Sequence, residues 1–210
     1  MGDRPRLVCF DLGGVLVRIC RSWEEGCAAA GVDLRPDYRP DEAGETRRRQ
    51  AVDALQRGAI TRDQFWATVS DTFRGVYTPE EISRVHRAWL LGEYTGVGDI
   101  IDRLHERAVA TACLSNTNEP HWEDLVGYDS LRRLQARYAS HEMGLAKPDA
   151  AIYQAFEREV GASGDEILFF EDTPENADAA ADLGWKTCVV DPHTETAAQI
   201  EAALREHGLL

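Results

Sequence analysis

The sequence predicts an α/β protein in which a doubly wound, mostly parallel sheet carries an inserted helical lobe. Two observations lead to this fold class. Short apolar runs alternate with helical stretches along much of the chain, and one segment breaks that alternation with a succession of helix-start signals. The 210 residues suffice to bury a substantial core, but they favour one domain with an insertion over two independent domains.

Four short apolar runs are predicted to be buried parallel strands, because each is largely apolar and ends at a polar residue. The runs span residues 7–10, 108–114, 167–170 and 186–190, and the residues that follow them are Asp11, Ser115, Glu171 and Asp191. Helical stretches at 149–160 and 177–183 separate the later runs, which makes the predicted sheet Rossmann-like. Ligands of such sheets bind at the carboxyl ends of the strands, so we expect these four residues to meet in one crevice.

The segment from about residue 18 to residue 98 is predicted to form the helical lobe. It has no comparable apolar strand, and its helix-start signals are Ser22-x-x-Glu25, Thr61-x-x-Gln64 and Thr78-Pro-x-Glu81. We therefore predict a core of residues 1–17 and 99–210 and a lobe of residues 18–98. The tryptophans of the lobe are expected to form its core, although they would also suit a sugar-binding face. They are Trp23, Trp66 and Trp89.

The composition limits the classes of partner. The net charge of −14 repels phosphate backbones and anionic lipid, so we expect neither nucleic acid nor a membrane as a partner. The five cysteines show neither C-x-x-C nor zinc spacing, which favours reduced thiols in a cytoplasmic protein. Residues 1–6 are polar and precede only a short apolar run, so we expect neither a signal peptide nor a membrane span. Whether the protein is a monomer or a homodimer stays open.

The histidines are expected to serve packing or to lie on the surface rather than to bind metal. His86, His105, His121 and His141 show no metal-ligand spacing among them. Carboxylates are therefore better candidates than imidazoles for the ligands of a metal site.

Two strand ends carry residues suited to binding a phosphate ester. Asp11 follows the first strand and enters the turn Gly13-Gly14, whose backbone can approach a bound group closely. Ser115 and Asn116 follow the second strand and begin a run of small hydrogen-bonding side chains that can grip phosphate oxygens. Taken alone, the first pattern is also typical of a turn, and the second of a helix N-cap with its loop.

Lys147 and an acid pair complete the pattern. Pro148 holds Lys147 just ahead of a helix, where its ammonium offers a fixed positive charge. Glu171 and Asp172 end the third strand, and carboxylates clustered there repel one another unless a cation compensates them. With Asp11 converging on the same edge, Mg²⁺ and Lys147 would supply that compensation. Four independent turns are a poor explanation for these patterns in this order.

The four patterns resemble the four sequence motifs of the haloacid dehalogenase superfamily. Asp11 stands in the first motif, Ser115 in the second, Lys147 in the third and Glu171-Asp172 in the fourth. The likeness spans residues 7 to about 191, and the inserted lobe resembles the helical type-1 cap of that family. Within the superfamily, the segments most similar to the group of bacterial α-D-glucose-1-phosphate phosphatase are 57–61, 114–118 and 144–153.

The resemblance implies a phosphatase for a small phosphorylated metabolite, with a sugar phosphate as the first expectation. Asp11 would attack phosphorus and form an aspartyl-phosphate that water later hydrolyses. Mg²⁺ would be held by Asp11, the backbone carbonyl of Gly13 and Asp172, with Glu171 binding it directly or through another ligand. The cap would close to exclude water. The residues implied to bind the phosphoryl oxygens are Ser115, Asn116 through its amide, and Lys147.

Gly13 departs from many phosphatases of this family, which carry a second Asp there as the general acid toward the leaving group. General acid catalysis contributes ~10²- to 10⁴-fold, so its loss leaves weak activity unless another group or a better leaving group substitutes. The glucose-1-phosphate phosphatase group looks similar at this position, and an anomeric oxygen leaves more readily than a simple alkoxide.

Two alternative functions remain open. One is a haloacid dehalogenase, in which Asp11 attacks carbon without a metal; that branch resembles a Tyr rather than Gly13 and does not require the acid pair. The other is a binding protein that kept the fold and lost the reaction. Gly13 favours this second alternative, whereas intact Asp11, Lys147 and Asp172 argue against it.

Overall fold

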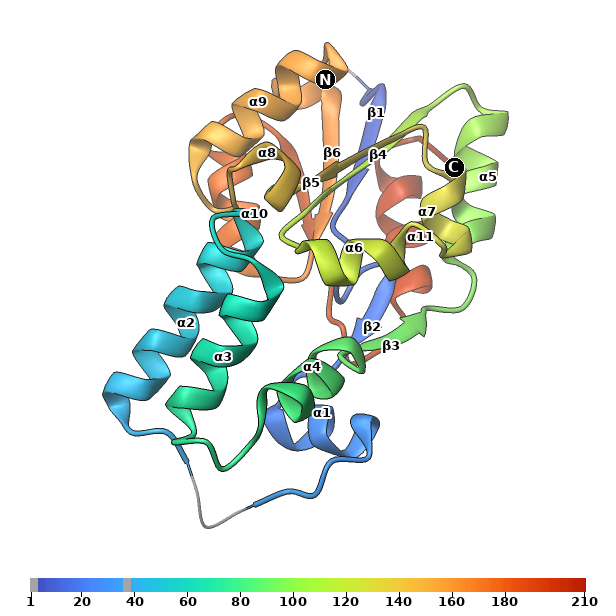
Figure 1. Cartoon of the computed structure of the whole chain (residues 1–210). Helices are drawn as coiled ribbons and strands as arrows, with labels where there is room; N and C mark the ends of the chain where they lie inside the picture. Colours follow the sequence, from blue (N-terminus) through green and yellow to red (C-terminus); the bar gives the residue numbers. More distant parts are fainter. Residues whose placement is uncertain (1–3, 36–38) are drawn as a thin grey trace.

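The computed structural model describes residues 4–35 and 39–210, and its centre is a five-stranded parallel sheet. The strand order is β5-β4-β1-β6-β7 (Figure 1), which confirms the predicted doubly wound α/β class. The strands are β1 (Leu7–Phe10), β4 (Ala110–Ser115), β5 (Ala136–Ala139), β6 (Ile167–Glu171) and β7 (Lys186–Val189).

Alternation along β1 explains why helices cover both faces of the sheet. Val8 and Phe10 point into one hydrophobic cluster with α5 (Val97–Glu106) and α11 (Thr196–Glu206), while Leu7 and Cys9 point into another with α9 and α10. Figure 1 shows these two pairs of helices on opposite sides of the sheet. Of the helices just named, α9 spans Ala150–Val160 and α10 spans Pro174–Ala181. This part also contains α6 (Glu119–Leu125), α7 (Asp129–Arg133), α8 (Ser140–Met143) and a 3₁₀ turn at Gly164–Glu166.

Three strands were not predicted from the sequence, because each is short and partly polar. β5 lies at the edge of the sheet, and only its last residue is fully buried. β2 (Val17–Ile19) and β3 (Leu90–Glu93) form an antiparallel pair at the base of the inserted segment, where no strand was expected. β4 also begins two residues later than predicted, since Ala108 takes a positive φ of 57° in the turn before it.

Among the described residues, four helices form the inserted lobe, and three of them begin at the predicted sequence signals. Ser22, Thr61 and Thr78 each accept a backbone N–H at a helix start, and the last two form complete capping boxes. Asp41 caps the remaining helix and was not predicted. The lobe has a hydrophobic cluster of its own, which includes Phe65, Tyr77 and Val85. Its helices are α1 (Trp23–Ala30), α2 (Glu42–Gln56), α3 (Arg62–Thr72) and α4 (Pro79–Arg87). The domain boundaries at residues 17/18 and 98/99 stay a prediction.

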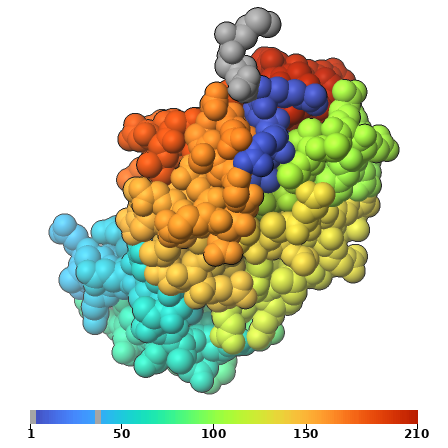
Figure 2. Space-filling view, turned by 90° about the horizontal axis from the view of Figure 1, so that it is seen from above, coloured from blue at the N-terminus to red at the C-terminus, as the bar shows by residue number. Residues whose placement is uncertain are grey.

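Polar contacts join the lobe to the sheet domain on the side of α2 and α3. Arg57 pairs with Asp149 at 2.9 Å, and Arg62 reaches Glu123 at 2.6 Å. The Ser140 hydroxyl donates to the carbonyl of Gln56 at 2.6 Å. Figure 2 shows the cyan and teal residues of α2 and α3 directly against the yellow-orange segment that includes α8. Among the residues described, no helix is long and apolar enough to cross a bilayer.

Candidate active site

The carboxyl edge of the sheet brings three carboxylates together. β1 and β6 are neighbours in register, Phe10 opposite Phe170, so the residues after this pair, Asp11 and Glu171, lie side by side. One oxygen of each of Asp11, Glu171 and Asp172 lies within 4.8 Å of the others. Asp191 does not join them, because it is exposed and its Oδ1 accepts the backbone N–H of His193. The expected crevice therefore gathers Asp11, Ser115 and Glu171 but not Asp191.

Lys147 lies between two of these carboxylates. Its side chain is fully buried, and its Nζ lies 2.5 Å from Glu171 Oε2 and 3.1 Å from Asp11 Oδ1. Burial alone would lower the pKa of Lys147, but the two carboxylates together raise it above its ordinary value. The Lys147–Pro148 peptide bond is cis, and α9 begins two residues after Pro148. The Lys147 ammonium therefore lies beside Asp11, where the sequence analysis expected a fixed positive charge.

Asn116 positions Lys147 through the backbone. Its side-chain amide donates to the carbonyl of Lys147 and its side-chain oxygen accepts the N–H of Lys147, each at 2.8 Å. The side chain of Asn116 is thus occupied in holding the Lys147 loop. Ser115 is buried at the end of β4, in the strand that neighbours β1. Nearby, Ser140 Oγ accepts the N–H of Thr117 at 2.9 Å, which fixes the loop that follows Ser115.

The surroundings of the Asp11 carboxylate favour a bound cation. Burial, reinforced by the charge of Glu171 and opposed by Lys147, raises its pKa to about 6. Its Oδ1 is buried and accepts no hydrogen bond from the described residues, although Lys147 pairs with it. Three carboxylate groups at one edge are the hard oxygen donors that Mg²⁺ prefers. The residues present therefore fit a divalent cation.

Arg21 is a member of this cluster that the sequence analysis did not find. Its Nη1 lies 2.7 Å from Asp172 Oδ2, and the Arg21 side chain is one third exposed. A Cβ added at Gly14, where φ is +80°, would come within 2.4 Å of both groups, so glycine is required for their approach. No local motif marks Arg21, because it precedes α1 in the inserted segment and meets Asp172 only in the fold.

These features agree with a match to known proteins. A family model for haloacid dehalogenase-like hydrolases matches residues 5–184. The chain belongs to the haloacid dehalogenase-like (HAD-like) hydrolase family. This confirms the superfamily expected from the four motifs, whereas the α-D-glucose-1-phosphate phosphatase subgroup stays a prediction.

Solved structures share the fold of this HAD-like hydrolase at low sequence identity. An HAD family enzyme from Bacteroides thetaiotaomicron is 22% identical, with a TM-score of 0.76 over 94% of this chain and 99% of that one. An HAD-like family hydrolase from Porphyromonas gingivalis is 25% identical, with a TM-score of 0.73 over 97% and 99%. L-2-haloacid dehalogenase from Xanthobacter autotrophicus is 17% identical, with a TM-score of 0.60 over 95% and 82%. The Bacteroides enzyme has also been solved in complex with magnesium and inorganic phosphate.

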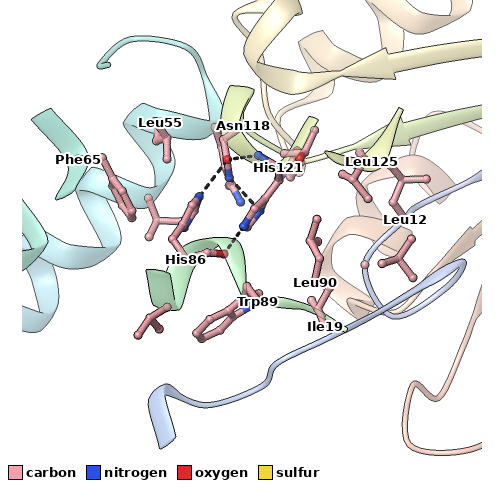
Figure 3. A pocket seen from close by; sticks show the side chains of 18 of the residues that line it. Leu12, Ile19, Leu55, Phe65, His86, Trp89, Leu90, Asn118, His121 and Leu125 are labelled. Atoms are coloured by element: carbon pink, nitrogen blue, oxygen red, sulfur yellow. Dashed lines mark hydrogen bonds between the residues drawn. The ribbon is translucent and has the colours of Figure 1, made fainter. Parts of the chain in front are cut away.

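A cavity of about 240 Å³ lies between the carboxyl edge of the sheet in this HAD-like hydrolase and its helical lobe. On the sheet side it is lined by Leu12, Gly13, Ser115 and Asn116, so it opens directly onto the turn after Asp11. Figure 3 shows Leu55, Phe65 and Trp89 from the lobe facing Leu12 and Leu125 from the sheet domain across this space. This cavity was not predicted, because its lining comes from segments far apart in the chain.

Two histidines and an asparagine form a hydrogen-bonded network in the cavity wall, which also includes the polar residues Arg48, Gln56, Ser115, Asn116 and Thr117. The rings of His86 and His121 stack at 4.0 Å, and burial lowers the pKa of both, that of His86 to about 3. As neutral rings, His86 Nε2 donates to Asn118 Oδ1, Asn118 donates to His121 Nδ1, and His121 Nε2 donates to the carbonyl of His86 (Figure 3). This network links α4 of the lobe to α6, and it agrees with the expected packing role of the histidines.

Proposed function

We propose that the chain is a Mg²⁺-dependent phosphatase that hydrolyses a small phosphorylated metabolite through an aspartyl-phosphate at Asp11. The observation that carries this proposal is the cluster of Asp11, Glu171 and Asp172, of which Asp11 and Glu171 contact the buried ammonium of Lys147. A reactive carboxylate beside fixed positive charge and hard oxygen donors suits transfer of a phosphoryl group.

The metal-binding residues in this proposal are Asp11, the backbone carbonyl of Gly13 and Asp172, with Glu171 binding the ion directly or through another ligand. The structurally similar Bacteroides enzyme has been solved in complex with magnesium and inorganic phosphate, which supports Mg²⁺ as the ion. When bound there, Mg²⁺ would neutralise the negative charge that develops on the phosphoryl group in the transition state.

The residues of the chain itself would then act as follows. A cation bound beside Asp11 would favour its ionised carboxylate, which can attack phosphorus. Lys147, pinned by Glu171 and by the side chain of Asn116, would bind a phosphoryl oxygen without reorganising. Ser115 and the backbone amide of Asn116 would bind the remaining oxygens. The helical lobe would exclude water from the site.

The finer expectation of a sugar phosphate rests on the resemblance to α-D-glucose-1-phosphate phosphatase and stays a prediction. It makes glucose 1-phosphate one member of a substrate panel. The other members are acetyl phosphate, p-nitrophenyl phosphate and further sugar phosphates, which differ in the leaving group but share the phosphoryl group.

The test of this function is phosphate release from that panel, with and without Mg²⁺, by the native chain and by Asp11→Asn. We expect metal-dependent release that falls by roughly 10³-fold or more in the variant, because the covalent nucleophile is lost. Release that is unchanged in Asp11→Asn would contradict the proposal. Halide release from a 2-haloacid without metal would favour the dehalogenase alternative, and inactivity toward all compounds would favour the binding protein.

A further inference from the structure

The cavity beside the catalytic turn is placed to receive the part of the substrate that leaves phosphorus. This inference rests on the proposed phosphatase function. Gly13, Ser115 and Asn116 line the cavity on one side and flank the proposed phosphoryl site on the other. The leaving group of a phosphoryl ester held at Asp11 would therefore extend into the cavity.

The walls of the cavity are mainly apolar and include aromatic rings. The lobe contributes Leu55, Phe65, Ile82 and Trp89, and all but Trp89 are nearly completely buried. Leu90 and Leu125 complete the opposite wall (Figure 3). Such a surface gains free energy by covering an apolar group, whereas it leaves the hydroxyl groups of a sugar without partners.

Part of the polar lining is engaged in hydrogen bonds within the wall, and Gln56 and Thr117 add two further polar side chains to it. His86, His121 and Asn118 exchange hydrogen bonds among themselves, and burial keeps both imidazoles neutral at pH 7. Arg48 pairs with Glu45 on its own helix at 2.8 Å. Trp23 Nε1 is buried without a hydrogen-bond partner among the described residues, so it is one donor available to a ligand. The wall therefore suits an uncharged ligand with few polar atoms.

The wall also lacks, among its described residues, a group suited to protonate the leaving oxygen. The position of a general acid in related phosphatases is Gly13 here, and a Cβ built at Gly13 would lie 3.0 Å from Ile19 Cδ1. Ile19 thus fills the space in which an acidic side chain would begin. The protons on the two imidazole Nε2 atoms already donate to Asn118 and to the His86 carbonyl. A leaving group that departs readily without protonation is therefore favoured.

We propose that the substrates of this site are aryl phosphomonoesters, compounds in which an uncharged aromatic ring carries the phosphate. The volume of about 240 Å³ agrees with this class. A cavity of about 150 Å³ lined by apolar residues is enough to bind benzene, so this one accepts a substituted ring.

The reaction balances without a proton donor in its first step. The bond from Asp11 oxygen to phosphorus forms as the bond from phosphorus to the aryl oxygen breaks, and the electron pair leaves with that oxygen as an aryloxide. The aryloxide takes a proton from water after release. A water molecule then attacks phosphorus and restores the Asp11 carboxylate, and its proton passes to the phosphate product.

The experiment compares three esters that carry the same size of ring: phenyl phosphate, cyclohexyl phosphate and glucose 1-phosphate. Phenyl phosphate should exceed cyclohexyl phosphate in kcat/KM by roughly 10²-fold or more, because only its oxygen leaves easily. Cyclohexyl phosphate should inhibit with a Ki about 10-fold lower than that of glucose 1-phosphate, because its ring has no hydroxyls to desolvate. A higher kcat/KM for glucose 1-phosphate than for phenyl phosphate overturns the inference. So does a lower Ki for glucose 1-phosphate than for cyclohexyl phosphate.

Acetyl phosphate separates this inference from the proposed function, because its leaving group is too small to test the cavity. Asp11-dependent release from acetyl phosphate together with a preference for glucose 1-phosphate overturns the inference alone. Absence of Asp11-dependent release from acetyl phosphate overturns the proposed function and the inference with it.

A pair of variants tests whether the cavity itself sets the preference. Val52 lines the cavity and is 37% exposed, whereas Val126 lies outside the lining and is 39% exposed, so a polar residue is tolerable at both. Val52→Asn should lower the kcat/KM ratio of phenyl to acetyl phosphate about 5-fold. Val126→Asn should leave the ratio unchanged. Equal ratios in both variants would overturn the assignment of the ring to this cavity.

Discussion

The carboxyl edge of the sheet and the cavity above it meet at Gly13, but their polar side chains are paired in different ways. Charged groups form ion pairs at the edge, whereas neutral groups share hydrogen bonds in the cavity wall. At the edge, Lys147 lies between Asp11 and Glu171, and Arg21 lies against Asp172. In the cavity wall, neutral imidazoles hydrogen-bond to Asn118 among aliphatic and aromatic side chains. Charge therefore suits the edge to the phosphoryl group, and apolar surface suits the cavity to the remainder of the substrate.

Removing the ammonium at the edge should have the largest effect. Lys147→Met leaves Glu171 and Asp11 as buried carboxylates without their cation, so we expect the free energy of unfolding to fall by about 3–5 kcal/mol. Phosphate release should fall by roughly 10²-fold or more. Urea unfolding with and without Mg²⁺ measures the first effect, and added Mg²⁺ should restore part of the stability.

The control is Lys186→Met, which replaces the only other lysine of the sequence. Lys186 is partly exposed, and its Nζ donates to the backbone carbonyl of Asp165 at 2.8 Å and lies 3.9 Å from the Asp165 carboxylate. Its loss should therefore cost only about 1 kcal/mol. Equal destabilisation by the two substitutions would contradict the role given to Lys147.

Much of the carboxyl edge was predictable because its residues directly follow, or lie close to, strands of low polarity. The local sequence around Asp11, Ser115 and Glu171 predicts both a strand and the polar side chain at its carboxyl end. Asn116 was predicted to bind phosphate through its amide, which stays a prediction, whereas the role of its side chain in holding the backbone of Lys147 was not predicted. That contact joins residues 31 positions apart and has no local signature.

The cavity was not predictable in the same way. His86 and His121 belong to separate helices, α4 and α6, and only the docking of the lobe stacks them. β5 escaped prediction because an edge strand of four residues shows little of the apolar continuity of a central strand. Features that depend on packing between distant segments therefore remained beyond the reach of periodicity and motif spacing.

Supplying an acid at Gly13 should change which leaving groups the site accepts. Gly13→Asp alone should destabilise the fold by about 1 kcal/mol, since Ile19 must move away from the new Cβ. Combined with Ile19→Ala, it should raise kcat for cyclohexyl phosphate about 10-fold or more, because the leaving oxygen can then be protonated. Steady-state kinetics on cyclohexyl and phenyl phosphate check this. An equal gain on both esters would contradict a general-acid effect.

The neutral histidines of the cavity should make stability depend on pH. His86 titrates near 6.5 when unfolded but near 3 in the fold, so below pH 6.5 the unfolded state binds the extra proton. Stability is therefore complete above pH 7 and falls as the pH drops. Because His86 remains partly accessible, we expect a loss of about 1 kcal/mol between pH 7 and 5.5.

Urea unfolding of the native chain and of His86→Gln across this pH range measures that loss. The variant should lose less stability than the native chain, because its amide does not titrate. His193→Gln is the matched control, since His193 is exposed and should leave the native pH dependence in place. An identical pH dependence in the native chain and His86→Gln would contradict a neutral, buried His86.

Arg21 should produce the smallest of these effects. It pairs with Asp172, a proposed magnesium ligand, but its side chain is one third exposed and solvent weakens the pair. Arg21→Gln should therefore tighten Mg²⁺ binding only about threefold, as measured by titration calorimetry. Arg18→Gln, which removes a nearby exposed guanidinium, should leave the affinity unchanged. Weaker Mg²⁺ binding in Arg21→Gln would indicate that Arg21 supports the site rather than competing with the ion.

The proposed covalent role of Asp11 can be tested on the protein itself. The chain is mixed with acetyl phosphate and Mg²⁺, quenched in acid during turnover, digested and examined by mass spectrometry. We expect a phosphoryl group on the peptide that contains Asp11, and none on that peptide in Asp11→Asn. Turnover without a phosphorylated Asp11 peptide, or with the phosphoryl group on another residue, would contradict the aspartyl-phosphate mechanism.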